Sequence, residues 1–331
     1  MPLSFCCPLC KGALDFDGKS YSCPSCIKKY PVVLGIADFR VFPDPYISIE
    51  ADYKKGQWIA QQADRLSFQE LVRLYWKITP EVSEDRAEHF MRHVFTLVEK
   101  GAERLKEIER LDRHEGRFHS ILELGCGTGG FLVAAKDRFQ DVIGIDIAFR
   151  WLVIAKKRLN ELGVSLPLVC GCAESLPFKD GSYDVIAADN VLAHVKDQEA
   201  ALRECRRVLN NDGVLFLTTP NRFSIRSEPH VGVWGVGFLP RFLTDRYVYW
   251  KKGIRYRHIR LPSRFELKRM LSESAFRSWS ISPPRITESE QARASRFEQN
   301  LIRLYHWLRQ LPVFSFLFQI FGPFLQIIGR K

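Results

Sequence analysis

An acidic residue followed by a run of glycines is the first part of the sequence that could bind a ligand. Gly125, Gly127 and Gly129 follow Glu123 at the end of a short apolar stretch with β character. Glycine is needed where the backbone turns sharply and where a ligand must approach it closely. The next residues have helical spacing, so the turn leads to a helix N-terminus with unpaired N–H groups and a partial positive charge. The segment therefore predicts a strand, a tight turn and a helix arranged around a ligand.

Two ligand classes fit such a turn, a dinucleotide and S-adenosylmethionine. Gly125, Gly127 and Gly130 satisfy the pattern G-x-G-x-x-G of dinucleotide sites, which is weak evidence by itself. Glu123 favours S-adenosylmethionine, because its carboxylate suits a cationic amino-acid end and would repel a pyrophosphate. Asp146 ends the next predicted strand and can hold both ribose hydroxyls of either ligand.

Here the chain resembles the class I S-adenosylmethionine-dependent methyltransferases, and most closely their large type 11 group. The matching motifs are E-L-G-C-G-T-G-G, the acid of G-I-D-I, A-E-S-L-P-F and Y-D-V-I-A-A-D-N-V-L-A-H-V, all within residues 120–221. The resemblance implies an enzyme that transfers a methyl group from this cofactor, but it says little about the acceptor. It also implies the cofactor-binding residues, which are Glu123, Gly125, Cys126, Gly127, Gly129, Asp146, Ile147, Ala173, Glu174 and Asn190.

Four cysteines near the N-terminus have the spacing of a metal site. Cys7, Cys10, Cys23 and Cys26 form the pattern C-x2-C-x12-C-x2-C. Each pair is expected on a tight knuckle turn, and Asp17-Gly18 suits the turn of a short hairpin between the pairs. Nine cysteines in a chain that begins without an export signal indicate a reducing compartment, where a metal is a better interpretation than disulfides. Four thiolates close a tetrahedral zinc site with no position for water, so the predicted role of zinc is structural. Cys6 is an alternative ligand beside Cys7.

Three residues are candidates for acid–base chemistry on an acceptor. His194 lies beyond Asn190, in the loop after the fourth predicted strand, where the transferred methyl group should point. A lone histidine there can equally be a hydrogen-bond donor or a helix-end residue. Glu228 and His230 form a polar pair in a long insertion after the fifth predicted strand. A hydroxyl acceptor needs a base for its proton, whereas an activated carbon or a phenolate needs little help.

The elements that must position these residues alternate between strand and helix. Strands are predicted at 120–124, 141–147, 166–172, 183–190 and 213–219, and helices at 130–139, 149–162 and 198–209. This alternation predicts an α/β fold with a doubly wound, mostly parallel sheet and ligands at the carboxyl ends of its strands. With the resemblance, we expect the seven-stranded sheet of the Rossmann-like methyltransferase fold.

The chain divides into four predicted parts. They are a zinc ribbon at 1–42, a helical linker and cap at 43–116, the methyltransferase domain at 117–285 with an insertion at 222–260, and a C-terminal helix with an apolar tail at 286–331. The helices of the second part either cap the cofactor cleft or pack plainly against the sheet.

Positive charge is concentrated in the last third of the chain. From Asn221 to Lys331 there are 20 Lys and Arg against 7 Asp and Glu, whereas the whole chain has 49 against 38. This excess indicates an anionic partner, namely nucleic acid, a phospholipid surface or a phosphorylated substrate, or else a solvated face. The insertion also interleaves aromatic residues with cations, which suits stacked bases, a lipid headgroup layer or an ordinary helical lid.

The apolar tail holds 18 uncharged residues in a row, at 311–328. This length barely reaches a membrane span, and Gly322 and Pro323 interrupt it. We therefore expect a segment that lies in, or dips into, one leaflet of a membrane. A helix packed on the core and a dimer contact are the alternatives.

Two enzymatic functions fit these features. The first is a cytoplasmic methyltransferase, peripheral at the inner face of the membrane, with a small-molecule, quinone-like or lipid-linked acceptor. The second is a ribosomal RNA base methyltransferase that recognises RNA through the ribbon. The resemblance weakens the second, because such ribbons usually use a His ligand and because neither N-P-P-Y nor D-P-P-Y follows the fourth strand. A non-enzymatic alternative is a cofactor-binding scaffold for a partner protein.

Overall fold

The chain forms two compact units in the computed structural model, which describes residues 5–79, 82–112 and 116–331. Unit 1 is Met1–Val185 and unit 2 is Ile186–Lys331. Strand β8 (Tyr183–Asp189) crosses the division between them.

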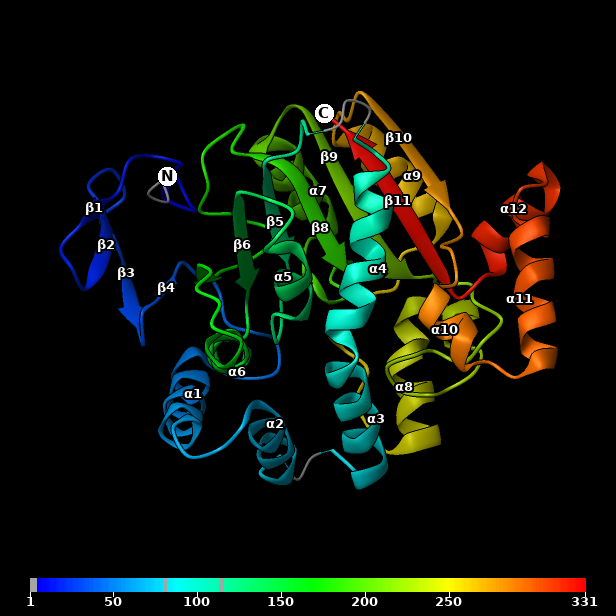
Figure 1. The fold of residues 1–331 in the computed structure, drawn as a ribbon, viewed down its shortest axis with the longest axis horizontal. Coiled ribbons are helices and arrows are strands. Elements are labelled where there is room, and N and C mark those ends of the chain that lie inside the picture. The colour runs from blue at the N-terminus through cyan, green and yellow to red at the C-terminus, as the bar shows by residue number, and fades with distance from the viewer. Residues whose placement is uncertain (1–4, 80–81, 113–115) are drawn as a thin grey trace. The chain divides into compact units, whose positions relative to one another are not determined.

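Unit 1 contains a sheet with the strand order β1-β2-β3-β4-β7-β6-β5 (Figure 1). Neighbours among β1 to β4 pair antiparallel, whereas β4, β7, β6 and β5 run parallel. The strands are β1 (Asp15–Phe16), β2 (Ser20–Cys23), β3 (Lys28–Val33), β4 (Ile36–Asp38), β5 (Ser120–Leu124), β6 (Asp141–Asp146) and β7 (Leu168–Cys170). Ile121, Leu122 and Ile143 are fully buried, as expected for parallel strands that helices cover.

The four-cysteine segment is continuous with this sheet. Its hairpin turns at Asp17 and Gly18, as the sequence predicts: Gly18 has a φ of 86°, and the Asp17 carboxylate accepts the backbone N–H groups of Lys19 and Ser20. Strand β4 then pairs in parallel with β7, with Ala37 opposite Val169 and Asp38 opposite Cys170. The predicted ribbon thus extends the sheet that carries the cofactor motifs.

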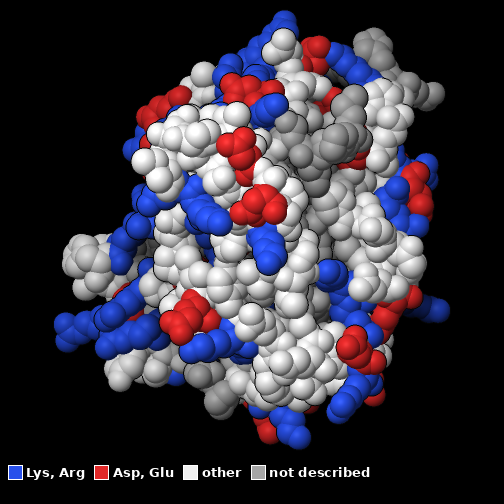
Figure 2. Space-filling model, turned by 90° about the vertical axis from the view of Figure 1, so that its left-hand side faces the viewer, with Lys and Arg blue, Asp and Glu red and all other residues white. Residues whose placement is uncertain are grey.

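Helices of the predicted linker pack against the helices of the βα units. The helices of unit 1 are α1 (Ile49–Ala63), α2 (Phe68–Lys77), α3 (Glu84–Phe95), α4 (Leu97–Glu109), α5 (Gly130–Ala135) and α6 (Phe149–Glu161). Helices α1 and α2 lie against α6, and α4 lies against α5. On the face that carries β1 to β3 and α1, acidic and basic side chains are interspersed (Figure 2).

Unit 2 contains the strands β9 (Leu209–Pro220), β11 (Phe324–Arg330) and β10 (Ser278–Ser282), in that order and antiparallel. Its helical elements are η1 (Leu192–His194), α7 (Gln198–Val208), η2 (Val236–Phe238), α8 (Arg241–Lys252), α9 (Arg264–Glu273), α10 (Glu288–Arg293), α11 (Arg296–Leu308) and α12 (Pro312–Phe321). The insertion has a small core of its own, formed by Val231, Val233, Val236, Val248 and Tyr256.

The α/β class and the Rossmann-like arrangement are confirmed. The structure has more strands than the seven predicted, and several of them pair antiparallel. Strands β1 to β7 already make seven in the described part of unit 1, and unit 2 adds three antiparallel ones. The extra strands come from the ribbon and from the C-terminal segment. Periodicity could not show that the ribbon and the C-terminal segment join these sheets, because the joining pairs, β4 with β7 and β11 with β9, are more than a hundred residues apart.

The prediction that residues 311–328 lie in a leaflet is wrong for the last five of them, 324–328. Residues from Phe324 onwards form β11, which pairs with β9 on one side and β10 on the other. Leu325 and Ile327 are buried there. The apolar run therefore combines an exposed helix, α12, with an internal strand. Among the described residues, no helix is long and apolar enough to cross a bilayer.

Candidate active site

The glycine turn after β5 is pinned to the neighbouring strand and left open on its outer side. The backbone N–H groups of Gly125 and Cys126 donate to the Ile145 carbonyl at 2.8 and 3.1 Å. Gly125, Gly127 and Gly129 all have a left-handed backbone. A Cβ atom added at Gly127 would meet no atom within 4 Å, so the space above the turn is free for a ligand.

The fourth glycine of the run has a different role. A Cβ atom at Gly130 would lie 2.3 Å from Cβ of Leu97, on helix α4. Gly130 therefore allows α4 to approach the start of α5 closely. The G-x-G-x-x-G match at this position reflects helix packing, which is also how the third glycine acts in nucleotide-binding turns.

Asp146 is fixed against the glycine turn. Its Oδ2 accepts the Gly127 N–H at 2.8 Å, and its Oδ1 accepts the Ala148 N–H at 2.8 Å. Burial raises the pKa of Asp146, although the two N–H groups act in the opposite direction. Each carboxylate oxygen retains acceptor capacity, so the side chain can also hold two hydroxyl groups, as a ribose requires.

Glu123 has a cationic neighbour that the sequence did not reveal. Arg158, on α6, is buried, donates to the Val94 carbonyl at 2.8 Å and stacks 3.9 Å from the Phe68 ring centre. Burial lowers the pKa of Arg158 to about 10, while the Glu123 carboxylate raises it. The signal in the sequence was a charged residue among the apolar positions of the helix 149–162.

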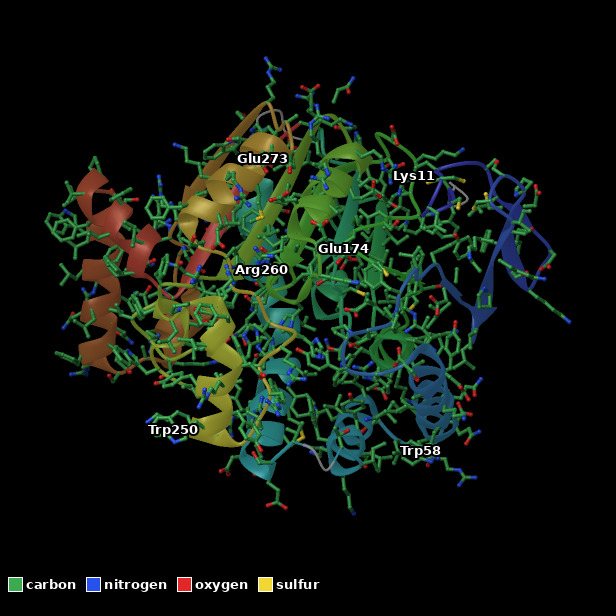
Figure 3. The ribbon with its side chains drawn as sticks, turned by 180° about the vertical axis from the view of Figure 1, so that it is seen from behind. Lys11, Trp58, Glu174, Trp250, Arg260 and Glu273 are labelled. Carbon is green, nitrogen blue, oxygen red and sulfur yellow. The ribbon has the colours of Figure 1, made fainter. Side chains whose placement is uncertain are left out.

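The loop after β7 carries the predicted adenine-side residues. Ala173 is buried and Glu174 is half-buried in this loop (Figure 3). The Ser175 N–H donates to the Cys172 carbonyl at 3.1 Å, which forms a tight turn around the two residues. Ile147, also predicted, directly follows Asp146.

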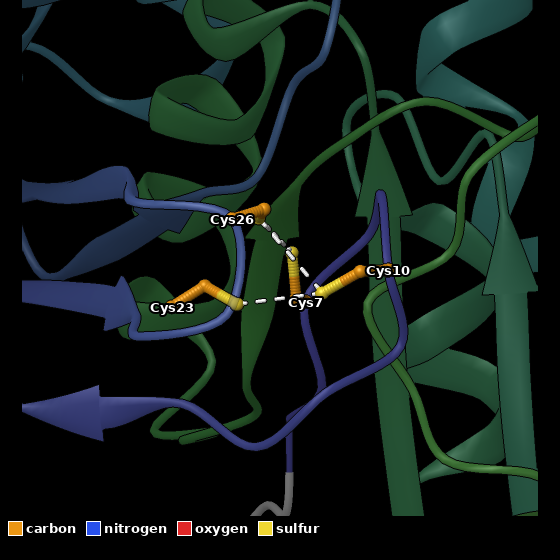
Figure 4. A group of neighbouring side chains, drawn as sticks. All are labelled: Cys7, Cys10, Cys23 and Cys26. Atoms are coloured by element: carbon orange, nitrogen blue, oxygen red, sulfur yellow. Dashed lines mark hydrogen bonds between the residues drawn. The ribbon is translucent and has the colours of Figure 1, made fainter.

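The four predicted metal ligands converge in the ribbon (Figure 4). The Sγ atoms of Cys7, Cys10, Cys23 and Cys26 all lie within 4.8 Å of one another, with 3.4 Å between Cys7 and Cys26 and 3.8 Å between Cys10 and Cys26. Tetrahedral Zn–S bonds of about 2.3 Å place the sulfurs about 3.8 Å apart, so the residues fit zinc. Cys6 is not part of the group, because its Sγ donates to the Phe178 carbonyl at 3.1 Å.

Unit 2 brings the three predicted acid–base residues together. Nε2 of His194 lies 3.0 Å from Nε2 of His230, and Nδ1 of His230 lies 2.5 Å from Oε1 of Glu228. The other oxygen of Glu228 accepts the backbone N–H groups of His230 and Val231 at 2.8 and 2.7 Å. Glu228 thus orients His230, and His230 in turn meets His194. Their catalytic role remains a prediction.

The end of the insertion is tied to the element that carries His194. The Arg260 N–H donates to the Ala193 carbonyl at 2.8 Å, and Nε2 of Gln198 donates to the Arg260 carbonyl at 2.7 Å. Figure 3 labels Arg260 and also Trp250, which is on helix α8.

Asn190, directly after β8, has a left-handed backbone with a φ of 57°. Within the described part of the chain its buried Oδ1 has no hydrogen-bond partner.

The half-buried position of His194 predicts a pH-dependent loss of stability. Burial, with a smaller contribution from His230, lowers the pKa of His194 from 6.5 to about 3. Below about pH 6.5 the unfolded chain binds a proton at His194, whereas the folded chain does so only near pH 3. The folded state therefore loses stability as the pH falls from about 6.5 to about 3. Urea unfolding at pH 7 and pH 5 should show a smaller loss of stability for His194→Gln than for the unaltered chain. An equal loss in both would contradict the assignment.

Comparison with known proteins was consistent with the geometry. Residues 122–217 match the family model described as a methyltransferase domain. Over 100 residues the chain is 36% identical to the "Uncharacterized methyltransferase YcgJ" of Bacillus subtilis, covering 30% of this chain and 40% of that protein. Over 163 residues it is 28% identical to a ubiquinone biosynthesis O-methyltransferase of Idiomarina loihiensis, covering 49% of this chain and 63% of that protein.

The crystal structure of the YcgJ protein is also similar, with a TM-score of 0.42 and 24% identity over 65% of this chain and 92% of that chain. The chain spans less than two thirds of either curated relative.

Proposed function

We propose that the chain is an S-adenosylmethionine-dependent methyltransferase, on the premise that residues 122–217 are a methyltransferase domain. It transfers the methyl group to a hydroxyl group of a quinone-like or lipid-linked small molecule at a membrane surface. In this proposal the enzyme is cytoplasmic and peripheral at the inner face of the membrane. The observation that carries it is the Asp146 carboxylate, which is fixed 2.8 Å from the backbone of an open glycine turn.

The residues of unit 1 hold the cofactor in this proposal. Asp146 accepts the ribose hydroxyls, Glu123 faces the cationic amino-acid end, and Ala173 and Glu174 lie beside the adenine. Bound S-adenosylmethionine supplies a methyl group that its sulfonium already activates. The protein must therefore mainly align the acceptor and exclude water, and positioning supplies much of the rate.

The His194–His230–Glu228 cluster removes the proton of the acceptor hydroxyl. Glu228 accepts the Nδ1–H of His230, which leaves Nε2 of His230 as an acceptor for the Nε2–H of His194. Nδ1 of His194 then takes the proton from the acceptor while its Nε2 proton passes to His230, whose positive charge Glu228 balances. This relay is needed because burial lowers the pKa of His194, so His194 cannot itself keep the proton at physiological pH. The ubiquinone O-methyltransferase relatives support a hydroxyl on a quinone-like ring as the acceptor.

Four cysteine thiolates hold a structural zinc ion in the same proposal. Their convergence within 4.8 Å supports it, and a closed four-sulfur site leaves no position for a reacting water. Zinc therefore contributes to folding and takes no part in methyl transfer.

Exposed apolar side chains on α11 support the membrane surface. Phe297, Leu301 and Leu304 recur at helical spacing and form what we call the outer stripe; Phe297 is 71% exposed. The opposite side of α11 is held by a polar bond: Nε2 of His306 accepts the Ile286 N–H at 3.2 Å. A helix oriented in this way turns its apolar side to solvent, which marks a site of interaction.

Helix α12 continues this surface. It lies beside α11 in Figure 1, the Tyr305 and Phe318 ring centres are 5.0 Å apart, and Val313 is 69% exposed. Within 296–321, which spans α11 and α12, the chain has three Arg against one Glu, so the surface is complementary to anionic headgroups. Apolar rings with flanking cations are typical of helices that lie in a membrane interface.

Replacing Phe297, Leu301 and Leu304 by serine should weaken sedimentation with vesicles of phosphatidylglycerol and phosphatidylcholine by about tenfold or more, because apolar area leaves the lipid. Ile27→Ser with Leu162→Ser is the matched control, since Ile27 is 91% exposed in the ribbon. Equal partitioning of both variants would refute the membrane surface. A truncation after Gln310 is unsuitable, because it would also delete β11.

Labelled S-adenosylmethionine, offered in parallel to lipid extract and to total RNA, tests the acceptor class. Label in the lipid fraction supports the proposal, and label in RNA supports ribosomal RNA base methylation instead. The interspersed charges around the ribbon in Figure 2 favour the lipid outcome, since RNA binding needs a basic surface. Absence of transfer to both fractions would favour a cofactor-binding scaffold.

A further inference from the structure

The ribbon contacts the loop that carries the predicted adenine-side residues. The Cys6 N–H donates to the Pro177 carbonyl at 3.0 Å, and the Ser175 hydroxyl donates to the Pro8 carbonyl at 2.6 Å. Pro8 lies between two of the metal-site cysteines, and Cys6 precedes the first. The backbone around Cys7 is therefore joined on both sides to the loop of Glu174.

A second contact joins the ribbon to the segment that follows Asp146. Arg40, just beyond β4, forms an ion pair with Asp38, with 2.6 Å between Nη2 and Oδ2. Nη1 of Arg40 donates to the Ile147 carbonyl at 3.2 Å and to Oδ2 of Asp52 at 2.7 Å. Arg40, which follows the last strand of the ribbon, thus contacts Ile147, the residue after the predicted ribose-binding Asp146.

Asp52, on α1, is the centre of this second contact. It is 0% exposed, and its two oxygens accept the backbone N–H groups of Phe149 and Arg150 at 2.9 and 3.2 Å. These are the first N–H groups of α6, whose own N-cap, Ala148, has no side chain that could cap them. Arg150 returns the contact, with 3.0 Å from Nη1 to Oδ1 of Asp52 and 3.0 Å from Nη2 to Asp44.

Such a buried cluster needs an explanation beyond stability. Asp38, Asp44, Asp52, Arg40 and Arg150 are all buried, and burial of charges costs free energy that their mutual attraction only partly offsets. Apolar residues would pack the same space at lower cost, but they would not fix the position of each partner. The cluster holds three separate segments, namely the end of the ribbon, α1 and the start of α6, in one register.

We infer that the metal-loaded ribbon is part of the cofactor site and sets the affinity for S-adenosylmethionine, an inference that rests on the proposed function. The ribbon has too few residues for a core of its own, so its fold depends on the metal. Loss of the metal releases the backbone around Cys7 and the position of Arg40 together. The loop of Glu174 and the segment after Asp146 then lose their supports, and both halves of the nucleoside are bound less tightly.

Calorimetric titration with S-adenosylhomocysteine tests this inference on the whole chain. Zinc content is measured by atomic absorption, and the metal is removed with a chelator or by Cys10→Ser. We expect affinity to fall by about tenfold or more on metal loss and to return when Zn²⁺ is added back to the chelated protein. An unchanged affinity of metal-free protein with a native circular dichroism spectrum overturns the inference.

Two variants separate this link from general destabilisation. Asp52→Asn and the milder Ser175→Ala should weaken ligand binding while one zinc ion per chain is retained. Ile108→Ala, on the buried face of α4, should lower the melting temperature without this loss of affinity, and Lys29→Ala, exposed in the ribbon, should change neither. If Asp52→Asn and Ser175→Ala both bind S-adenosylhomocysteine as tightly as the unaltered chain does, the inference is overturned. Absence of ligand binding even in the zinc-loaded, unaltered chain overturns the proposed function instead.

Discussion

Asp146→Ala will remove most of the affinity for S-adenosylmethionine. The carboxylate that the variant lacks accepts the N–H groups of Gly127 and Ala148 and, in the proposed complex, both ribose hydroxyls. Hydrogen bonds to a charged group contribute about 1.5–3 kcal/mol each, so two lost bonds to the ligand correspond to a weakening of about a hundredfold or more. Calorimetry with S-adenosylhomocysteine measures the effect.

Asp137→Ala is the matched control for this experiment. Asp137 is an exposed acid of the same unit, just after α5, and within the described part of the chain it pairs with its neighbour Lys136. Its loss should leave the affinity unchanged. Tight binding of NADH by the unaltered chain, with no response to S-adenosylhomocysteine, would contradict the whole assignment of the glycine turn.

Glu228→Gln and His194→Gln will slow methyl transfer while cofactor affinity is retained. Glu228 orients His230 through a 2.5 Å contact, and an amide cannot balance the charge of a protonated imidazole. General-base catalysis contributes about a hundredfold to ten-thousandfold, so a loss of about a hundredfold in kcat is expected. Single-turnover transfer to a prenylated catechol, measured between pH 6 and pH 9, tests it.

His258→Gln provides the comparison, because His258 is an exposed histidine of the same insertion and is outside the cluster. It should retain the full rate. An undiminished rate in Glu228→Gln, on an acceptor that the unaltered chain methylates, would mean that the acceptor is an activated carbon or a phenolate and that no base is needed.

Local signals predicted those parts of the molecule in which a few consecutive residues determine the geometry. The turn at Asp17 and Gly18, the cysteine knuckles and the left-handed glycines after Glu123 each follow from backbone chemistry over four to ten residues. Helices 149–162 and 198–209 were predicted to within one residue at each end, because their apolar spacing is regular.

Long-range partners could not be predicted in this way. Asp52 and Arg150 are separated by 98 positions, and both look like ordinary surface residues in a helical pattern. The sequence places the segment from Phe324 in a membrane-facing tail, because an apolar run does not reveal whether its partner is lipid or β9. The convergence of His194 on His230 likewise depends on how the insertion folds.

The position of β11 between β9 and β10 has a consequence for biosynthesis. The ribosome makes β9 first and β10 about sixty residues later, yet the strand that joins them comes last. Until then, the nascent chain presents two unsatisfied strand edges and an apolar surface that only the final partner can cover. Unit 2 can therefore complete its folding only after β11 has been synthesised. Before that, chaperones that bind extended apolar segments can bind the exposed strands.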